Sequence, residues 1–273
     1  MDRNSPNRAD QDPQADAISD ALRRARQADT PLAEYPGQRP ETLADAYDIQ
    51  SRSIAAWPDT VTGWKVGGVP PALQEQYGAK RLAGPVFSQT VYRANSDETL
   101  KVPAYQGFVA VEAEWVFELG DCSHLGDTGL TESDVMSAIK AAYIGVELAS
   151  SPIIDINSYG PAVVISDFGN NYGLVIGDAV EDWSSETLSQ IEACVEIDGE
   201  VIGRKPTLPG LDGPHGAVKF LIEHLKSQNT EGLSGLYVSS GAITGVHDSR
   251  IGATSKVTFA GVGEMTLDIV PIG

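Results

Sequence analysis

The sequence predicts an α+β fold in which a mixed β core carries peripheral helices. Glycine is frequent, with 28 residues among 273, and this composition suits a chain that turns often between short strands. Several segments have the side-chain alternation of strands, most clearly Val109–Leu119. The chain has no internal repeat and no regular alternation of strand and helix, which argues against a doubly wound parallel sheet.

Composition divides the chain into three parts. Residues 1–14 are polar and contain proline, so we expect this segment to be frayed. Residues 15–59 form a helical portion, with one helix over Ala15–Gln27 and a second that begins after Thr42, a good N-cap residue. Residues 60–273 form the mixed β core, and the chain is long enough to bury a proper interior.

Turn signals and strand patterns locate the elements of the core. The pair Asp198-Gly199 predicts a tight hairpin turn within Ala193–Gly203. Ser158–Phe168 is expected to be a loop that leads into a strand. The expected helices cover Pro71–Tyr77, a segment from Thr131 to about Lys140, and a segment that begins at Pro214. The remaining expected strands or extended pieces are Val61–Val66, Gly84–Tyr92, Leu100–Val102, Val109–Leu119, Ala142–Ser150, Tyr172–Ile176, Leu236–Ser240, Lys256–Phe259 and Met265–Val270.

Charge and cysteine content exclude several classes of protein. The formal net charge is −19, whereas nucleic-acid and anionic-membrane partners need basic patches. An anionic substrate would need local positive charge from a metal or a lysine, although a salt-adapted source would explain the acidity equally well. No apolar run approaches about 18 residues, and the N-terminus lacks the apolar stretch of a signal peptide. Cys122 and Cys194 form no recognisable framework, so we expect reduced thiols and a cytoplasmic protein.

The segment Val109–Leu119 reads VAVEAEWVFEL and presents two different faces. Its odd positions form an unbroken apolar face, whereas Glu112 and Glu114 lie side by side on the other. Such a pair is the kind of ligand set that a divalent cation prefers. The alternative is an amphipathic strand whose glutamates face water, and Glu118 on the same face supports that interpretation. The pair alone leaves both interpretations open.

Two other stretches have a chemical interpretation. Lys65 lies in GWKVG, a strand-like segment with few other charges, where a lysine can recognise a carboxylate or polarise a carbonyl. It can equally be an edge-strand lysine. Ser239–Gly245 reads SSGAITG and can present backbone N–H groups to an anion, or it can be a plain glycine turn. The four histidines lack metal-ligand spacing, and no nucleotide-binding or nucleophile-elbow motif is present.

The order of these segments resembles the 2-keto-4-pentenoate hydratase / 4-oxalocrotonate decarboxylase family of the fumarylacetoacetate hydrolase superfamily. The resemblance runs from about Thr30 to the C-terminus. Its most specific parts are GWKVG and the E-x-E pair, which is followed about 33 residues later by a strand glutamate. The resemblance implies a mixed β-sandwich or roll of the fumarylacetoacetate hydrolase C-terminal-domain type, with an N-terminal helical portion, in a chain that is usually oligomeric.

The same resemblance implies the site residues. It assigns a bound Mg²⁺ or Mn²⁺ to three glutamates, and an active-site lysine to GWKVG. Asp167 matches a family aspartate near the site, and Gln89 takes the position of a hydratase aspartate. The candidate residues are therefore the metal ligands Glu112, Glu114 and Glu147, the catalytic residues Lys65 and Asp167, and the substrate-binding residues Lys65, Gln89 and Ser240.

The function implied is a metal-dependent hydratase, a lyase that acts on 2-hydroxy-2,4-dienoic or 2-oxo acids in meta-cleavage catabolism of aromatic compounds. The alternatives are a 4-oxalocrotonate-type decarboxylase, an acylpyruvate C–C hydrolase, and an inactive scaffold subunit of a hydratase–decarboxylase complex. The chain departs from the hydratase pattern after GWKVG, at Ser88-Gln89 and at Leu233-Ser234-Gly235. The expected partners are a small-molecule acid and further copies of this chain or a paralogous subunit, with no nucleic acid and no membrane.

Overall fold

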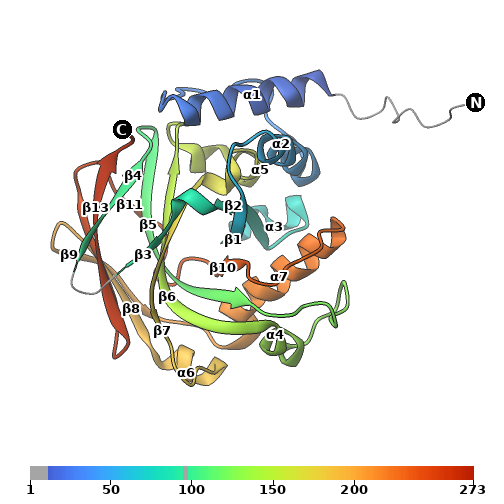
Figure 1. Ribbon diagram of the computed structural model, residues 1–273. Coiled ribbons are helices and arrows are strands. Elements are labelled where there is room, and N and C mark those ends of the chain that lie inside the picture. Colours follow the sequence, from blue (N-terminus) through green and yellow to red (C-terminus); the bar gives the residue numbers. More distant parts are fainter. Residues whose placement is uncertain (1–11, 95–97) are drawn as a thin grey trace, which may run out of the picture.

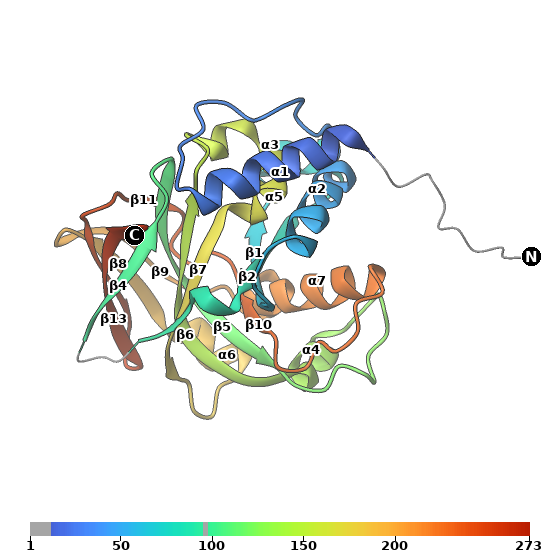
Figure 2. The same ribbon diagram turned by 45° about the horizontal axis from the view of Figure 1, so that its top comes forward.

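The computed structural model describes residues 12–94 and 98–273, so most of the predicted frayed segment lies outside the described residues. Two β-sheets face each other, and helices cover the far side of the larger one (Figures 1 and 2). The larger sheet has the order β2 (Arg81–Phe87), β1 (Val61–Gly68), β10 (Tyr237–Ser239), β5 (Phe108–Leu119), β6 (Ile139–Ser151), β7 (Asn171–Ala179) and β3 (Val91–Arg93), with β11 (His247–Asp248) paired to β5. The smaller sheet has the order β4 (Thr99–Ala104), β13 (Gly263–Pro271), β12 (Thr254–Phe259), β8 (Glu192–Ile197) and β9 (Glu200–Pro206).

Helices α1, α2, α3 and α5 lie on the side of the larger sheet that is remote from the smaller sheet, whereas α7 packs against the face of β5 that carries Phe117 (Figures 1 and 2). The capping box between Thr42 and Asp45 begins α2, as the N-cap prediction requires. None of the described helices is long and apolar enough to cross a membrane. The helices are α1 (Pro13–Gln27), α2 (Leu43–Ala55), α3 (Pro71–Tyr77), α4 (Glu132–Ala138), α5 (Pro161–Ser166), α6 (Ser185–Gln190) and α7 (Pro214–Ser227).

The main core fills the space between the two sheets. The odd positions of β5 point into it, and the Trp115 ring lies 4.9 Å from the Phe259 ring of β12, centroid to centroid. The even positions of β5 therefore point to the opposite face of the larger sheet. Glu112 and Glu114 are buried on that face, so the interpretation that they face water is wrong for both. The predicted mixed β-sandwich or roll with peripheral helices is confirmed.

Three boundaries differ from the predictions for physical reasons. Asp12 caps α1, and Pro13 occupies its first position, so Pro13 and Gln14 belong to the helix rather than to the frayed segment. The predicted strand Gly84–Tyr92 is interrupted by a 3₁₀ turn at Ser88–Thr90. The predicted loop Ser158–Phe168 is wrong, because it contains α5, which begins with a proline. All six residues of α5 are buried, and its apolar side chains pack in one cluster with residues of α1 and α2. The division into domains stays a prediction.

Candidate metal and substrate site

Four neighbouring strands carry the candidate residues to one place on the larger sheet. Lys65 of β1 is in register with Ser239 of β10, and β10 pairs in turn with β5. Glu112 of β5 stands directly opposite Glu147 of β6, while Glu114 stands opposite Gly145. The helix-facing positions of these strands are adjacent, so residues far apart in the sequence meet at the centre of the sheet.

The three glutamates form one compact acidic cluster. Each offers a carboxylate oxygen, and these oxygens lie within 4.8 Å of one another. Glu112, Glu114 and Glu147 are 6%, 0% and 1% exposed, respectively. Burial, together with the charge of Glu147, raises the pKa of Glu112 to about 8 and holds the pKa of Glu114 well above its usual range. Three buried carboxylates at this spacing need a positive partner.

The cluster fits a divalent cation. Glu114 Oε1 is buried and has no hydrogen-bond partner, so one acceptor inside the cluster has free lone pairs. Carboxylate oxygens are the ligands that hard divalent cations prefer. The set therefore has the donor chemistry, the unsatisfied oxygen and the spacing that a magnesium or manganese site requires.

Lys65 is the cation that faces this cluster from the protein itself. Its Nζ lies 3.4 Å from Glu147 Oε1 and donates a hydrogen bond of 3.0 Å to Asn170 Oδ1. Burial alone would lower the pKa of Lys65, but the charges of the three glutamates, that of Glu147 foremost, raise it above its usual value. The lysine is therefore a buried ammonium group rather than an edge-strand lysine in water.

Hydrogen bonds fix the orientation of two of the carboxylates. Glu114 Oε2 accepts from Ser239 Oγ and, at 2.9 Å, from the backbone N–H of Gly241. Glu147 Oε1 accepts from Asn171 Nδ2 at 3.0 Å. The first two donors come from the SSGAITG segment, so this segment does present an N–H group to an anion, and that anion is Glu114.

Asp167 is fully buried but is engaged by an arginine of the first helix. Arg26 Nε donates to Asp167 Oδ1 at 2.6 Å and Nη2 donates to Oδ2 at 2.9 Å, while Ser151 Oγ also donates to Oδ2. Arg26 also donates to the carbonyl oxygens of Asp167 and Asn171. The pair therefore ties α1 to the segment that carries the two site asparagines.

That segment turns sharply between Asp167 and Asn171. Phe168, Gly169 and Asn170 have φ angles of +54°, +66° and +54°, so three consecutive residues are left-handed. A Cβ on Gly169 would lie 2.9 Å from Lys65 Cε and 2.9 Å from the Gly84 Cα, which only glycine avoids. Left-handed non-glycine residues cost about 1–2 kcal/mol each, so the Arg26–Asp167 pair holds a strained turn in place.

A cavity of about 440 Å³ opens above the cluster. Lys65, Glu112 and Asn170 line it together with apolar side chains such as Leu82 and Val164. This volume is in the range of small-molecule sites. The site is thus a mostly apolar pocket with a buried cation and an acidic cluster at its wall.

The structure does not bring all of the candidate residues into this cavity. Asp167 is behind its wall, in the ion pair with Arg26. Gln89 is exposed in the 3₁₀ turn after β2, where its backbone N–H donates to Asp59, and it is not among the lining residues. Ser240 lines a neighbouring cavity.

Sequence reasoning missed four contributors to the site. Asn170 and Asn171 lie in the stretch ISDFGNNYG that the resemblance used, but their side-chain roles were not inferred. Ser239 directly precedes the predicted residue Ser240. Because side chains alternate along a strand, these two neighbours point to opposite faces of the sheet, and Ser239 is the one on the face that carries Lys65. Arg26 gave no signal, because it is one of three arginines in a polar helix.

Comparison with solved structures identifies the fold. No protein-family model matches the sequence, and no curated protein does. The 4-oxalocrotonate decarboxylase of Pseudomonas putida G7, solved with magnesium and adipate, superposes with a TM-score of 0.78 at 21% identity, over 97% of this chain and 100% of that chain. Fumarylpyruvate hydrolase of Pseudomonas aeruginosa, solved with Mn²⁺ and pyruvate, has a TM-score of 0.52 at 16% identity, over 80% and 94% of the two chains.

A third similar structure is 2-hydroxyhepta-2,4-diene-1,7-dioate isomerase of Mycobacterium marinum. It has a TM-score of 0.53 at 17% identity, over 79% of this chain and 77% of that chain. At these identities the likeness establishes the fold alone. The chain therefore has the fold of the fumarylacetoacetate hydrolase superfamily, as the resemblance in its sequence implies.

Proposed function

We propose that this chain is a divalent-metal-dependent enzyme that acts on 2-oxo or 2-hydroxydienoic acids, with the chemistry of a lyase. The observation that carries the proposal is the convergence of the buried residues Glu112, Glu114 and Glu147 with Lys65, beside a cavity that Glu112 and Lys65 line. The solved decarboxylase with magnesium and the solved hydrolase with Mn²⁺ support a cation of this kind. An inactive scaffold would have no evident use for an intact buried cluster.

The cluster would hold Mg²⁺ or Mn²⁺ through one oxygen of each glutamate. A cation held there would act as a Lewis acid toward the 2-oxo acid end of a substrate and would stabilise the negative charge that develops on it. The Ser239 and Gly241 donors hold Glu114, and the Asn171 donor holds Glu147, so the ligands are oriented before the cation arrives.

Lys65 is the group that recognises the substrate. Its ammonium group lines the cavity and is held by Asn170, so it can pair with a substrate carboxylate or carry a proton near the 2-oxygen. The apolar lining excludes water and strengthens both electrostatic interactions. The same arrangement serves a hydratase, in which water adds to the ketonised dienol, and a decarboxylase, in which the conjugated 2-oxo group accepts the electron pair that departing CO₂ leaves and becomes an enolate.

A C–C hydrolase is a weaker candidate. That reaction needs a group that activates water, and histidine is the commonest choice. None of the histidines of the described chain lines the cavity around Lys65, and His215 is fully buried elsewhere. Hydratase and decarboxylase therefore remain the two lyase activities that the cavity favours.

An absorbance assay tests this function. The chelated protein is supplied with 2-hydroxypenta-2,4-dienoate or with 2-oxohex-3-enedioate, and turnover is followed before and after Mg²⁺ is added. We expect turnover of at least one compound, dependent on the cation and lost in Glu114→Gln. Glu118→Gln is the matched control, because Glu118 lies on the same face of β5 but pairs with Lys140 at the surface. Absence of turnover with both compounds, with the cation bound, would favour the scaffold.

A further inference from the structure

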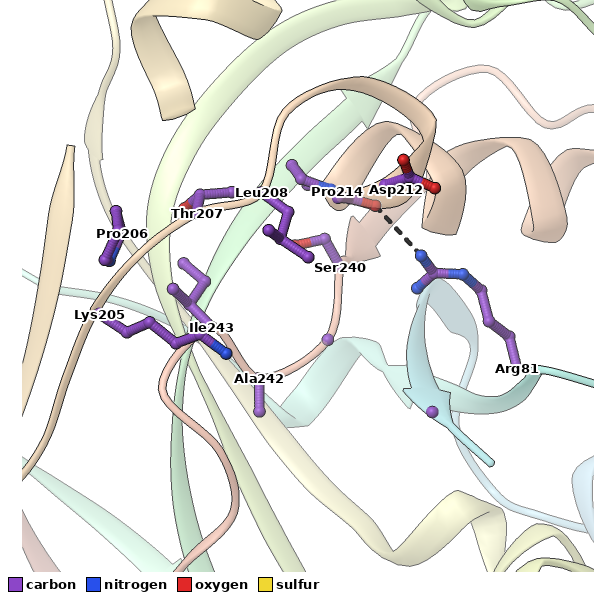
Figure 3. Close-up of a pocket in the computed structure, with 13 residues that line it drawn as sticks. Arg81, Lys205, Pro206, Thr207, Leu208, Asp212, Pro214, Ser240, Ala242 and Ile243 are labelled. Carbon is purple, nitrogen blue, oxygen red and sulfur yellow. Dashed lines mark hydrogen bonds between the residues drawn. The ribbon is translucent and has the colours of Figure 1, made fainter. Parts of the chain in front are cut away.

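A second cavity, of about 220 Å³, lies against the segment that follows β10 (Figure 3). Four parts of the chain meet there, namely the start of β2, the end of β9, the start of α7 and the segment Ser240–Ile243. Neither Lys65 nor any glutamate of the acidic cluster is part of the lining. The cavity is therefore separate from the candidate metal site.

Two cations line this cavity without a carboxylate partner. Arg81 and Lys205 approach it from opposite sides in Figure 3, and neither forms an ion pair with a residue that the structure describes. Arg81 is held at the cavity because its Nη2 donates to the Gly213 carbonyl oxygen at 3.1 Å. Burial lowers the pKa of Arg81, and no carboxylate offsets that effect. Asp212 also lines the cavity, but it pairs with neither cation.

The sign of this charge is unusual for the molecule. The chain has a formal net charge of −19, yet the lining of the second cavity has two cations and one carboxylate. A guanidinium that is partly withdrawn from water is stabilised when an anion accepts its N–H groups. The cavity therefore has the electrostatics of an anion site.

Ser240 supplies an independent observation. Its side chain is 5% exposed and lines the cavity, and it lies between the two cations in the view of Figure 3. Its Oγ is buried and has no hydrogen-bond partner among the described residues. A buried hydroxyl without a partner is unfavourable, and a bound acceptor would satisfy it. The hydroxyl and the two cations thus call for the same kind of ligand.

Helix α7 adds a further positive contribution. It has 14 residues and begins at Pro214, and its N-cap residue Gly213 offers no side chain to the free N–H groups of the first turn. Both residues line the cavity. The N-terminus of a helix favours anions, and phosphate groups in particular, because its dipole and its free N–H groups act together.

The number and placement of the donors indicate the shape of the anion. A guanidinium, an ammonium group and a hydroxyl come from three different elements and reach the cavity from different sides (Figure 3). A carboxylate has only two oxygens, which lie in one plane, whereas a phosphate or sulfate group has oxygens in four directions. Arginine also matches the geometry of phosphate oxygens with two parallel N–H groups.

We propose that the second cavity is an effector site for a tetrahedral oxyanion, either inorganic phosphate or the phosphate group of a small ester, held by Arg81, Lys205 and Ser240. Binding of the anion does not depend on the proposed function, because the acidic cluster forms no part of this cavity. The site goes beyond that function, since its ligand is neither the substrate nor the metal.

The chain itself links the two sites. Ser239 and Gly241, the two neighbours of Ser240, donate the hydrogen bonds that hold Glu114 of the acidic cluster. An anion that fixes Ser240 also fixes these two donors, and its negative charge favours a cation nearby. Occupation of the second cavity should therefore strengthen binding of a divalent cation, and the cation should strengthen binding of the anion by the same factor.

Calorimetric titration of the chelated, substrate-free protein tests the anion site. The probes are sulfate, inorganic phosphate, glycerol 3-phosphate and acetate, with the ionic strength held constant by chloride. We expect one site per chain for sulfate and phosphate, and at least about tenfold weaker binding of acetate. Tighter binding of glycerol 3-phosphate than of phosphate would identify an ester as the ligand, and weaker binding would identify the free ion. Absence of sulfate and phosphate binding, or acetate binding of equal strength, would overturn the proposal.

Substitutions locate the site. Arg81→Gln and Lys205→Gln should each weaken sulfate binding at least about tenfold, and Ser240→Ala about fivefold, as the loss of one hydrogen bond allows. Arg250→Gln, which alters an exposed arginine paired with Asp198, should bind sulfate as the parent does. Parent-like affinity in Lys205→Gln and in Ser240→Ala would place the anion elsewhere and refute the site. These two variants decide the matter even if Arg81→Gln fails to fold without its bond to Gly213.

The link to the metal site has its own readout. Mn²⁺ is titrated into the chelated protein with and without saturating sulfate, which, unlike phosphate, does not precipitate the ion. Sulfate should tighten Mn²⁺ binding about fivefold in the parent and have a much smaller effect in Ser240→Ala. Equal Mn²⁺ affinity with and without sulfate would refute the effector role. A protein that binds sulfate but no Mn²⁺ would refute the metal site, and with it the proposed function and the effector role, while the anion site stands.

Discussion

Glu112 of β5 and Glu147 of β6 are direct cross-strand partners, and both carboxylates are almost completely buried. Like charges directly opposite each other destabilise a sheet, and buried charges are costly unless they are paired. Compensation within the protein comes from Lys65, whose Nζ lies 3.4 Å from Glu147 Oε1. One ammonium group does not offset three buried carboxylates, so the pKa values of Glu112 and Glu114 rise, and a divalent cation would take the place of the protons that these groups then retain.

The first prediction concerns stability in the presence of metal. Mg²⁺ at about 100 times its dissociation constant should add roughly 2.7 kcal/mol to the free energy of unfolding of the parent. Glu147→Gln should lose this gain, because one ligand charge is gone and a repulsive pair has been relieved. Thermal melts with chelator and with added Mg²⁺ measure both. A melt of Glu118→Gln that also lost the gain would show that the effect is not specific to the cluster.

Lys65→Met should reduce turnover by at least about 10²-fold, because it removes the cation that serves the substrate while it keeps the bulk of the stem. It also leaves three buried carboxylates without their ammonium partner, so the metal-free variant should be less stable than the parent and should regain stability when Mg²⁺ is added. Activity assays and melts with and without Mg²⁺ check both effects. Lys140→Met, which alters a surface pair with Glu118, is the control. Parent-like turnover in Lys65→Met would make the lysine a bystander.

Arg26→Met should destabilise the protein by about 3–5 kcal/mol, since it leaves the buried Asp167 carboxylate unpaired. It should also weaken Mg²⁺ binding, because Asn171 and Asn170 lie on the turn that Arg26 holds. Urea unfolding measures the first effect and calorimetry the second. The exposed pair of Arg250 with Asp198 offers a comparison, and Arg250→Met should cost no more than about 1 kcal/mol. Equal costs for the two substitutions would refute a special role for the buried pair.

Acid should destabilise the protein partly through His215. Both ring nitrogens of His215 are buried without a hydrogen bond, and burial lowers its pKa below 6.5 although Glu132 lies 3.7 Å away. The folded state therefore resists protonation, so this group has no effect above pH 6.5. As pH falls below that value the unfolded chain takes up the proton first, and stability drops by up to about 1.4 kcal/mol per pH unit.

The variant His215→Phe tests this effect, because the ring keeps its contacts with Phe117 and Trp183. Urea unfolding at several pH values between 7.5 and 5 should give a shallower loss of stability than in the parent. Some dependence should remain, since burial also lowers the pKa of His224 and of His247. The exposed His124 provides the control, and His124→Phe should follow the parent curve. An unchanged slope in His215→Phe would contradict the assignment.

Local pattern predicted much of the fold. The alternation in Val109–Leu119 correctly assigned the odd positions to the core, and the Asp-Gly pair correctly predicted the β8–β9 hairpin. Whether Glu112 and Glu114 faced water or a buried site depended on α5 and the turn after it, which cover that face of the sheet. α5 itself was missed because its valines and isoleucine have no polar face, so helical periodicity is absent.

The candidate site was harder to predict from the sequence than the fold, because its residues are brought together by tertiary contacts. Glu147 was placed beside the pair by family resemblance alone, and the register of β5 with β6 gives the physical reason. Arg26 and Gln50 are polar residues of helices that turn out to be buried, and Gln50 donates to the carbonyl oxygens of Ala83 and Ile165. No spacing rule predicts such partners, because they lie more than 30 residues away in sequence.

The most direct test of the account is the number of Mn²⁺ ions that the cluster binds. Chelated protein is titrated with Mn²⁺, and the free ion is counted by electron paramagnetic resonance. The account predicts one tight site per chain, abolished in Glu112→Gln/Glu114→Gln and retained in Glu118→Gln. A parent protein that binds no Mn²⁺, or a double variant that binds it as tightly as the parent does, would contradict the claim that Glu112, Glu114 and Glu147 form a metal site.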